Sequence, residues 1–502
     1  MTWLQDLPVL VLGLGDSGLA MVRWCARHGA RVQVWDSRDA APHDGAIDGI
    51  ATRLRGDLDP ALLADVGLVL KSPGLAPHDP RIAPLLAAAT ERGTALMGEL
   101  GLFVRALADL EYSPQLLAIT GTNGKTTVTS MTALLVERAG KRVVAAGNVG
   151  PTMLDTLAAQ LDQPREEWPE VWVLELSSFQ LDGVQGFEPA AATVLNVTQD
   201  HLDWHGSMAA YTAAKARIFG SQAVMVINRD DETVAAMVPA LVIPKGRKTP
   251  AEPGRSVLRF GLEAPRHPGD FGLVVENGMA WLVRALPADE TVKPRKGEDL
   301  EIHLQRLMPA DALRVRGRHN AANALAALAL ATAIGCPLAP MLHGLREYRG
   351  EPHRVEPVGS VGGIEAYDDS KGTNVGATVA ALVGLGADVM PGRLVVILGG
   401  DGKGQDFAPL AAPVARHARA VALIGRDAAA IENALQGCGV RMATLATLPE
   451  AVQWAYDQAQ PGDAVLLSPA CASLDMFRNY AHRAEVFVEA VRALAVDRGE
   501  AI

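Results

Sequence analysis

The residues best suited to chemistry lie in one glycine-containing turn, Thr120–Thr127, which reads Thr-Gly-Thr-Asn-Gly-Lys-Thr-Thr. An apolar run precedes this turn and an amphipathic stretch, Val128–Ala139, follows it. That order predicts a strand, a phosphate-binding loop and a helix. Gly121 and Gly124 free backbone N–H groups to point at phosphate oxygens, and the N-terminus of the helix adds its dipole. The turn therefore predicts a nucleoside triphosphate site.

Two side chains at the start of the predicted helix strengthen this interpretation. Lys125 supplies a positive charge for the phosphates, and Thr126 supplies a hydroxyl ligand for Mg²⁺. The usual P-loop spacing has a glycine at the position of Ile119, so this loop is a variant, shorter on its glycine side. The alternative is an ordinary glycine turn before a surface helix, which would not need Gly-Lys-Thr-Thr at the helix start.

Groups that could hold the metal follow two later apolar runs. Glu175 closes the predicted strand Val171–Leu176, where Mg²⁺ ligands of phosphate-loop enzymes commonly sit; a capping or surface carboxylate is the alternative. His201 and His205 have the spacing of a zinc-binding helix face, but the Thr-Gln-Asp before His201 favours a strand-end loop. His201 then fits a hard-metal ligand near Glu175. Lys215 falls on an apolar-leaning helix, where a solvated lysine is the ordinary expectation.

The chain opens with a second nucleotide-type pattern. The predicted strand Pro8–Leu12 leads into Gly13–Gly18, and the next strand, Arg31–Trp35, ends at Asp36. This is the Gly-x-Gly-x-x-Gly fingerprint of dinucleotide binding, although any diphosphate ligand could use the same helix terminus. The turn Ser72–Gly74 follows a third apolar segment and is either a further ligand-binding position or an ordinary turn.

Three polar loops near the C-terminus each follow a predicted strand. They are Ala366–Gly376, Leu398–Gly404 and Ser468–Phe477. Because the carboxyl ends of parallel strands meet at one edge of a sheet, these loops predict a common ligand-binding rim. Cys471 has no neighbour in the sequence that would activate its thiol, so a nucleophilic cysteine is not expected.

Composition limits the class of protein. The chain has 502 residues, 49% of them hydrophobic and 21% charged, which is typical of a folded globular protein of several domains. The net charge of −11 argues against nucleic acid as the main partner, although a local cationic cluster could still bind small anions. Four cysteines without metal-type spacing indicate reduced thiols. With no leader pattern and no apolar run of membrane length, we expect a soluble cytoplasmic protein without a membrane partner.

Alternation of predicted strands and helices indicates an α/β fold with three domains. We expect a Rossmann-like domain over residues 1–112, a phosphate-loop domain with a mostly parallel sheet over 113–349, and a second Rossmann-like domain over 350–502. Pro244–Asp311 predicts short antiparallel strands and surface loops. The further predicted strands are Ala191–Asn196, Ala223–Asn228, Leu394–Leu398, Ala420–Ile424 and Ala464–Leu467.

Taken together, these segments resemble the Mur ligases, in order and over nearly the whole chain. The phosphate loop alone is shared with folylpolyglutamate synthase, whereas Asp369–Asn374 and Ser468–Phe477 favour the member of the family that adds D-glutamate. The matching segments are Thr120–Thr127, Glu175–Ser178, Asn196–His201, Gly317–Asn320, His353–Arg354, Asp369–Asn374 and Ser468–Phe477.

The resemblance implies that the first domain binds a UDP-sugar, the second ATP and the third the incoming amino acid. The implied contacts to UDP-N-acetylmuramoyl-L-alanine are Ser17, Gly18, Asp36, Ser37, Arg38, Ser72, Gly74, Asn148 and Ser177. Those to ATP are Gly121, Thr122, Asn123, Gly124, Lys125, Thr126, Thr127, Asn320, Asn323, Arg354, Asp369 and Lys371. Those to D-glutamate are Thr373, Lys403, Ser473 and Tyr480.

The resemblance also implies a mechanism. The terminal carboxylate of the acceptor takes the γ-phosphoryl group of ATP, and the amine of D-glutamate attacks the resulting acyl phosphate; a base near His201 is one hypothesis for deprotonating that amine. The catalytic residues would be Lys125, Glu175, His201 and Lys215, with Thr126, Glu175, His201 and a carbamylated Lys215 around Mg²⁺. The protein would act as a monomer in peptidoglycan precursor synthesis.

The chain departs from the family pattern in a few places. Asp16 puts an acid beside the expected diphosphate, and Tyr480 stands where phenylalanine is expected. Gln160–Glu170 and Ala285–Asp311 look like insertions.

Three other functions remain open at this stage. A ligase adding glutamate to a folate would lack a diphosphate pocket in its first domain. An NAD-dependent dehydrogenase would explain Gly13–Gly18 and Asp36 but not the phosphate loop. A nucleotide-regulated binding protein without ligase activity is opposed only by the metal-type and cationic residues gathered at strand ends.

Overall fold

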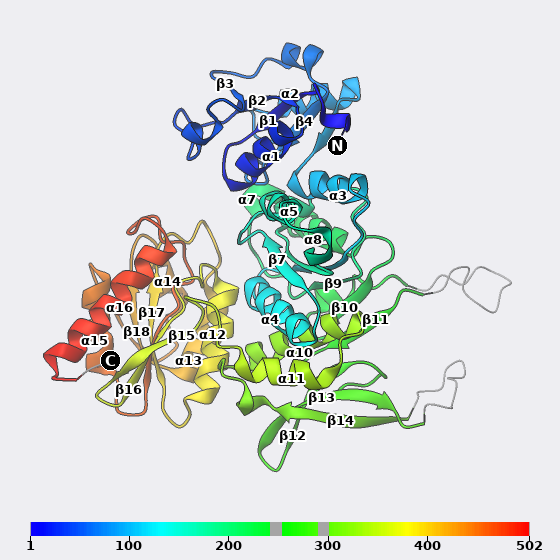
Figure 1. Cartoon of the computed structure of the whole chain (residues 1–502). Coiled ribbons are helices and arrows are strands. Elements are labelled where there is room, and N and C mark those ends of the chain that lie inside the picture. The colour runs from blue at the N-terminus through cyan, green and yellow to red at the C-terminus, as the bar shows by residue number, and fades with distance from the viewer. Residues whose placement is uncertain (1, 241–253, 290–300, 501–502) are drawn as a thin grey trace.

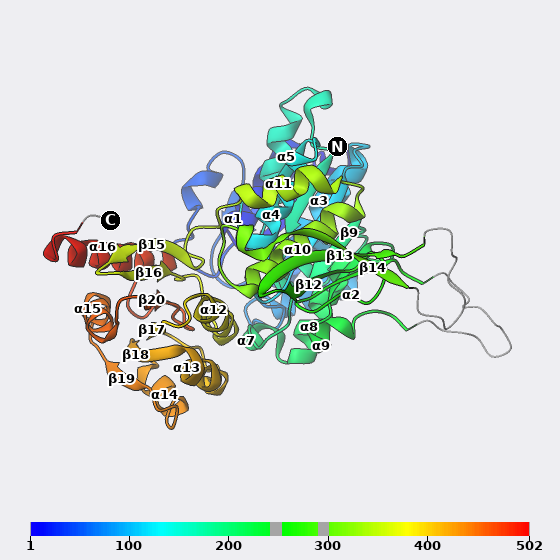
Figure 2. The ribbon, with the colours of Figure 1, turned by 90° about the horizontal axis from the view of Figure 1, so that it is seen from below.

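Three α/β units follow one another along the chain in the computed structural model, which describes residues 2–240, 254–289 and 301–500 (Figure 1). The N-terminal unit sits at one end of the middle unit, and the C-terminal unit lies to one side of it in both views (Figure 1, Figure 2). Each unit is built around a sheet of five or six strands. Within the described ranges, no helix is both long and apolar enough to cross a membrane.

The N-terminal unit has a parallel sheet with the strand order β3-β2-β1-β4-β5. The order reverses between β1 and β4, and open α/β sheets bind ligands outside the carboxyl ends of strands at such a point. Gly13–Gly18 and Ser72–Gly74 follow these two strands. The elements are β1 (Pro8–Leu12), α1 (Asp16–Arg27), β2 (Arg31–Trp35), β3 (Thr52–Leu54), β4 (Leu68–Lys71), α2 (Ala83–Arg92), β5 (Ala95–Met97) and α3 (Glu99–Asp109).

The middle unit has a six-stranded parallel sheet with the order β11-β10-β9-β6-β8-β7. Its strands are β6 (Gln115–Thr120), β7 (Val143–Gly147), β8 (Val171–Glu175), β9 (Ala191–Val194), β10 (Val224–Asn228) and β11 (Val257–Phe260). Its helices are α4 (Lys125–Arg138), α5 (Met153–Leu161), α6 (Ser178–Leu181), α7 (Leu202–His205), α8 (Met208–Ala216), α9 (Glu232–Ala235), α10 (Arg318–Ala333) and α11 (Leu338–Glu347).

The region Pro244–Asp311 is only partly as predicted. An antiparallel sheet of β12 (Phe271–Glu276), β13 (Met279–Pro287) and β14 (Ile302–Pro309) confirms the antiparallel strands. The prediction is wrong for β11, which pairs in parallel with β10 and extends the main sheet. Residues 241–253 and 290–300 of this region lie outside the described residues. The other segment interpreted as an insertion, 160–170, forms the end of α5 and a short 3₁₀ turn, Arg165–Glu167.

The C-terminal unit has a sheet with the order β15-β16-β20-β17-β18-β19, parallel except for the edge strand β15. That edge is a hairpin which the sequence analysis missed. The elements are β15 (Glu356–Val361), β16 (Ile364–Asp368), α12 (Val375–Asp388), β17 (Leu394–Gly399), α13 (Ala411–His417), β18 (Ala418–Ile424), α14 (Ala428–Ala434), β19 (Arg441–Thr444), α15 (Leu448–Gln458), β20 (Ala464–Leu467) and α16 (Tyr480–Asp497).

The hydrophobic cores do not follow the division of the molecule into three α/β units. One buried cluster runs from the N-terminal unit into the middle unit and includes Trp24, Phe103 and Trp172. The rings of Phe103 and Trp172 lie 5.0 Å apart between centroids. The two core clusters of the C-terminal unit contain only residues of that unit. The first two units therefore share a hydrophobic core. The C-terminal unit has separate cores, so it could move relative to the other two units without exposing buried apolar side chains.

Candidate active site

The strand, glycine-containing turn and helix predicted from the sequence are present, with the turn between β6 and α4. Gly124 is the N-cap of α4 with φ +83°, and Gly121 has φ +158°. A Cβ on Gly124 would lie 2.9 Å from Oδ1 of Asn323, and one on Gly121 would lie 3.0 Å from Cβ of Leu195. Both positions thus need glycine. Since Gly124 offers no side chain to cap α4, the first N–H groups of this helix remain available for an anion.

Lys125 begins α4 and turns back over the loop. Its Nζ donates hydrogen bonds of 2.9 Å to the carbonyl oxygens of Gly121 and Thr122. Burial lowers the pKa of Lys125, and the carboxylate of Glu175 opposes this shift. Burial deprives the Lys125 ammonium group of solvent. A triphosphate bound in the loop would compensate for this loss, because its oxygens could accept hydrogen bonds from the ammonium group.

Glu175 is well placed to be a ligand of a hard cation such as Mg²⁺. Its side chain is 2% exposed at the carboxyl end of β8. Oε1 accepts a hydrogen bond of 2.9 Å from Nδ2 of Asn148. The other oxygen, Oε2, is buried and has no hydrogen-bond partner among the described residues. A buried carboxylate oxygen without a partner is costly, and a divalent cation would satisfy it.

Lys215 is buried in α8 and is not the solvated lysine that its helix would suggest. The residue is 1% exposed, and Nζ donates to the Gly121 carbonyl at 2.8 Å and to Thr120 Oγ1 at 3.4 Å. Burial lowers the pKa of Lys215 well below its usual value, and the nearby Lys125 lowers it further. No carboxylate pairs with Nζ among the described contacts. Burial therefore favours the neutral amine of this lysine over its ammonium form.

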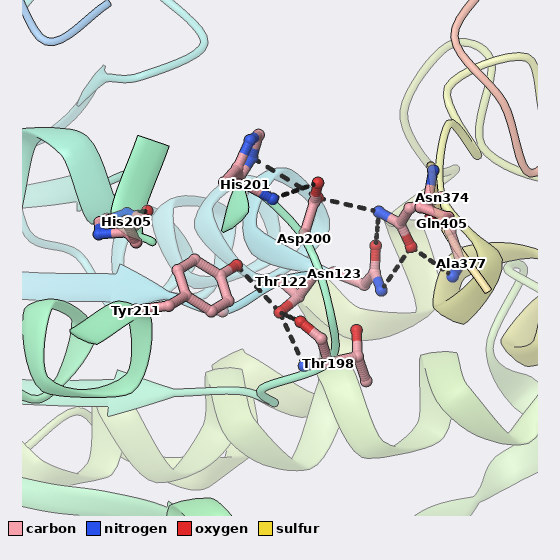
Figure 3. Close-up of polar contacts among 12 residues, drawn as sticks. Thr122, Asn123, Thr198, Asp200, His201, His205, Tyr211, Asn374, Ala377 and Gln405 are labelled. Atoms are coloured by element: carbon pink, nitrogen blue, oxygen red, sulfur yellow. Dashed lines mark hydrogen bonds and ion pairs between the residues drawn. The ribbon is translucent and has the colours of Figure 1, made fainter. Parts of the chain in front are cut away.

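His201 lies in a strand-end loop, as predicted, and not on a zinc-binding helix face. It is the N-cap of α7 with φ +54°, and its Nε2 is 3.5 Å from Oδ2 of Asp200 (Figure 3). Its ring packs edge-on against Phe179 with centroids 4.7 Å apart. His205 instead contacts Ser178 Oγ at 2.9 Å. The two histidine rings therefore contact different groups, which does not support a zinc site formed by both.

A cavity of about 340 Å³ brings the phosphate loop, the carboxylates and the C-terminal unit together. Arg354 crosses it and donates from Nη2 to Thr126 Oγ1 at 2.9 Å. The predicted metal hydroxyl thus contacts a guanidinium group in this arrangement. Among the predicted residues, the lining includes Thr122, Asn123, Gly124, Lys125, Thr126, Asn148, Glu175, His201, Arg354, Lys371, Thr373 and Lys403.

A smaller cavity, of about 70 Å³, lies on the other side of the loop. Asp369 lines it and is buried, with Ser468 Oγ donating to its carboxylate at 2.6 Å. Burial raises the pKa of Asp369 to about 7, although the hydrogen bond from Ser468 opposes the shift. The predicted nucleotide contacts that line this cavity are Asn123, Gly124, Thr127, Asn320, Asn323, Arg354, Asp369 and Lys371.

A cleft of about 470 Å³ lies over the switch point of the N-terminal sheet. Asp36 is 7% exposed; burial by itself raises the pKa of this carboxyl, but hydrogen bonds from Arg38 and from the Leu14 N–H hold it well below its usual value. Asp36 is therefore an anion that accepts from the glycine loop, and it fixes Arg38 beside the cleft. The predicted residues in the lining are Ser17, Asp36, Ser37, Arg38, Ser72, Gly74 and Asn148.

The predicted contacts that do not line these three cavities are Gly18, Gly121, Ser177, Ser473 and Tyr480, and the predicted metal ligand Lys215 does not line them either. A Cβ on Gly18 would come within 2.0 Å of the Gly13 carbonyl oxygen, so close packing requires glycine at this position. Ser177 caps α6 in a capping box with Gln180, and Gln180 lines the cleft instead. Ser473 is buried in the loop after β20. Tyr480 begins α16, with its ring 5.4 Å from Nζ of Lys371, which connects it to the larger cavity.

Several lining residues were missed by the sequence analysis. Asp79 and Arg81 reach the N-terminal cleft from the segment before α2, and Asp200 and Asn374 reach the larger cavity. Asp200 stands in the polar run before His201, which was a usable signal. Asn374 closes the Asp369–Asn374 segment, but only the fold places it against the phosphate loop.

Comparison with known proteins identifies the family. Family models match three successive parts of the chain: "Mur ligase MurD-like, N-terminal domain" at residues 8–98, "Mur ligase middle domain" at 119–266 and "Mur ligase, glutamate ligase domain" at 353–471. A UDP-N-acetylmuramoylalanine--D-glutamate ligase of Albidiferax ferrireducens is 60% identical over 510 residues, covering 100% of this chain and 99% of that protein. One of Burkholderia pseudomallei is 57% identical over 511 residues, covering 99% and 98%.

Solved structures share the fold at low sequence identity. The MurF ligase of Thermotoga maritima, in complex with ADP, has a TM-score of 0.57 at 15% identity and covers 98% of this chain and 96% of that one. The UDP-N-acetylmuramate-alanine ligase MurC of the same organism has a TM-score of 0.56 at 20% identity, covering 97% and 99%. With full-length relatives and matching domains, the chain belongs to the Mur ligase family, in the group of the UDP-N-acetylmuramoylalanine--D-glutamate ligases.

Proposed function

We propose that the protein joins D-glutamate to UDP-N-acetylmuramoyl-L-alanine in an ATP-dependent reaction that forms a peptide C–N bond. The acceptor's terminal carboxylate takes the γ-phosphoryl group and ADP leaves. The amine of D-glutamate then attacks the carbonyl carbon, and phosphate leaves as the amine loses a proton. The relatives at 57–60% identity carry the name of this reaction over their full length.

One observation carries the proposal. Asn148 and Val149 line both the N-terminal cleft and the cavity at the phosphate loop. The two sites therefore meet at the turn after β7. A ligand with its diphosphate at the N-terminal switch point can extend past Asn148 and present a carboxylate to a triphosphate at Lys125. A dehydrogenase or a folate ligase needs no such connection.

Each group of residues has a distinct task in this reaction. Asp36 and Arg38 hold the UDP end, while the loop Gly121–Gly124 and Lys125 offset the repulsion between the triphosphate and the carboxylate. Asn320, Asn323, Arg354, Asp369 and Lys371 hold the nucleotide between the middle and C-terminal units. Thr373 and Lys403 receive D-glutamate in the larger cavity, and we assign Ser473 and Tyr480 to the same amino-acid site.

A magnesium ion fits the donor set around Glu175. The unpartnered Oε2 of Glu175, the hydroxyl of Thr126 and the ring of His201 would hold it, and it would neutralise phosphate charge. Lys215 would add a carboxylate through carbamylation, in which its neutral amine bonds to CO₂ and releases a proton. Burial, which favours that neutral amine, supports this modification.

The same proposal covers organisation and location. We place the domain boundaries at 112/113 and 349/350, since each of the three segments then contains one main sheet. We also propose that the protein acts as a monomer in the cytoplasm.

The central test is phosphate release from ATP by the purified protein with UDP-N-acetylmuramoyl-L-alanine. We expect release with D-glutamate and a rate near background with L-glutamate or without an amino acid. Release that does not depend on the UDP-linked acceptor, or equal rates with both enantiomers, would contradict the proposal. Equilibrium binding of the acceptor to the nucleotide-free protein separates this ligase from one acting on folates.

Replacing Glu175 with glutamine should raise the Mg²⁺ concentration needed for half-maximal phosphate release by about tenfold or more, because the amide oxygen is a weaker ligand without charge. Asn148 can still donate to the amide oxygen, so the turn should stay in place. The measurement is a Mg²⁺ titration of the initial rate. Glu166→Gln, at an exposed position of the same unit, is the matched control. An unchanged Mg²⁺ dependence of Glu175→Gln would remove Glu175 from the metal site.

A further inference from the structure

A pair of carboxamides joins the phosphate loop to the C-terminal unit. Asn123 Nδ2 donates to Asn374 Oδ1 at 3.3 Å, and Asn374 Nδ2 donates back to Asn123 Oδ1 at 3.1 Å (Figure 3). The two residues are 251 positions apart in the sequence. The proposed function uses Asn123 as part of the nucleotide loop and gives Asn374 no task. Reciprocal pairing needs a donor and an acceptor on both sides, and a carboxamide offers the two on separate atoms.

Surrounding contacts fix the orientation of both side chains. Asn374 is the N-cap of α12, where its Oδ1 also accepts from the N–H of Ala377 at 2.9 Å. Its Nδ2 is turned toward Oδ2 of Asp200, at 3.5 Å. On the other side, the backbone of Asn123 is held by Asn196, whose Oδ1 accepts from its N–H at 2.8 Å and whose Nδ2 donates to its carbonyl at 3.1 Å. The pair therefore joins two well-supported elements.

The N-terminus of α12 is also connected to the two loops that carry the proposed D-glutamate contacts Thr373 and Lys403. Thr373 immediately precedes Asn374. The next N–H, of Val375, donates to Oε1 of Gln405 at 3.0 Å, and Gln405 Nε2 donates to the Gly402 carbonyl at 3.0 Å. Lys403 lies within that loop with φ +51°. A shift of α12 relative to the phosphate loop would displace both assigned D-glutamate contacts together.

We infer that Asn374 is a positioning residue that locks the C-terminal unit onto the phosphate loop and so aligns the amino-acid site with the nucleotide. The inference rests on the proposed function for its kinetic readout. The C-terminal unit has its own hydrophobic core, so polar contacts such as this pair decide how it docks. Asp200 contacts both Asn374 and His201, which is a proposed metal ligand. The position of the C-terminal unit is therefore connected to the proposed metal site as well as to the phosphate loop.

Two substitutions separate docking from helix capping. Asn374→Ser keeps a good N-cap but removes the donor to Asn123. Asn374→Asp keeps both the cap and the shape, yet it places a carboxylate against Asp200. A residue that only capped α12 would accept aspartate at least as well as serine, because a negative charge is favoured at a helix N-terminus. Docking predicts the reverse order, with Asn374→Asp the more impaired variant.

The experiment combines kinetics with solution scattering. We expect Asn374→Ser to lower kcat/KM for D-glutamate about tenfold, and the double variant with Asn123→Ser to lose no more than the worse single variant. Small-angle X-ray scattering with a non-hydrolysable ATP analogue and Mg²⁺ should give a larger radius of gyration for Asn374→Ser than for the parent. Thr447→Ala removes the N-cap of α15 in the same unit and should behave as the parent in both measurements.

Three outcomes would overturn the inference. The first is an Asn374→Asp variant that is at least as active as Asn374→Ser, and the second is a double variant whose loss of kcat/KM equals the product of the losses at Asn123 and Asn374. The third is parent-like scattering of both Asn374 variants. Unchanged melting temperatures of the two Asn374 variants would support it by excluding a loss of folding. Failure of the proposed function looks different, because the parent itself would then release no phosphate with the proposed substrates. The scattering comparison still applies in that case.

Discussion

Lys125→Ala should lower the rate of phosphate release by about a thousandfold while the protein stays folded. Among the described residues, the hydrogen bonds of Lys125 Nζ go only to the carbonyl oxygens of Gly121 and Thr122, so we expect its removal to leave the unit folded. The lost charge is the one that would face the phosphates in the transition state. The measurement is the initial rate with saturating substrates, together with the melting temperature.

Lys141→Ala is the matched control for this prediction, since Lys141 lies just beyond the other end of α4. It should release phosphate at the parent rate. If Lys125→Ala retained more than about a tenth of the parent rate, the charge would not act on the transferred phosphoryl group, and the assignment of the phosphate loop would be wrong.

Lys215→Ala should lose activity to a similar degree and regain part of it when acetate or formate is added. The expected loss of about a thousandfold follows from removing a metal-bridging carboxylate, and a small acid could enter the vacated space and replace it. Because burial lowers the pKa of Lys215, its amine can react with CO₂ without first being deprotonated at high pH. The measurement is the rate of phosphate release against acid concentration.

Lys125→Ala serves as the control for this rescue, because no carbamate is assigned to Lys125 and added acid should not help. Removing CO₂ from the buffers should also slow the parent enzyme gradually. A Lys215→Ala variant that shows no response to either acid would leave Lys215 as an unmodified lysine that supports the loop through its hydrogen bond to the Gly121 carbonyl.

Local patterns were enough to predict much of the fold. The strands Pro8–Leu12, Arg31–Trp35 and Ala464–Leu467 have the predicted bounds, because short apolar runs bounded by turn residues leave little choice. The failure at β11 has a physical reason. Val257–Phe260 follows a proline- and charge-rich stretch, and nothing in its own residues reveals whether its neighbour runs parallel or antiparallel.

The site was less accessible to sequence reasoning than the fold. Glu175 ends β8 and Lys125 follows the turn after β6, so their placement at one sheet edge follows from topology. The contact of Asn374 with Asn123 depends instead on how two separate units dock, which no local pattern encodes. Gly18 shows a feature that only the fold reveals: its place in the glycine pattern suggests a phosphate contact, which stays a prediction, and its lack of a side chain also permits the packing of α1 against Gly13.

The turn that carries Asn148 and Val149 has a consequence for inhibitor design. Both residues line the N-terminal cleft and the cavity at the phosphate loop. A single compound that occupies both sites must therefore have a linker that passes Asn148 and Val149. Chemical groups joined at that point would gain from simultaneous occupancy without having to mimic either nucleotide in full. Asn148 is itself tied to Glu175, so a linker that displaced this amide would disturb the carboxylate as well as block the passage.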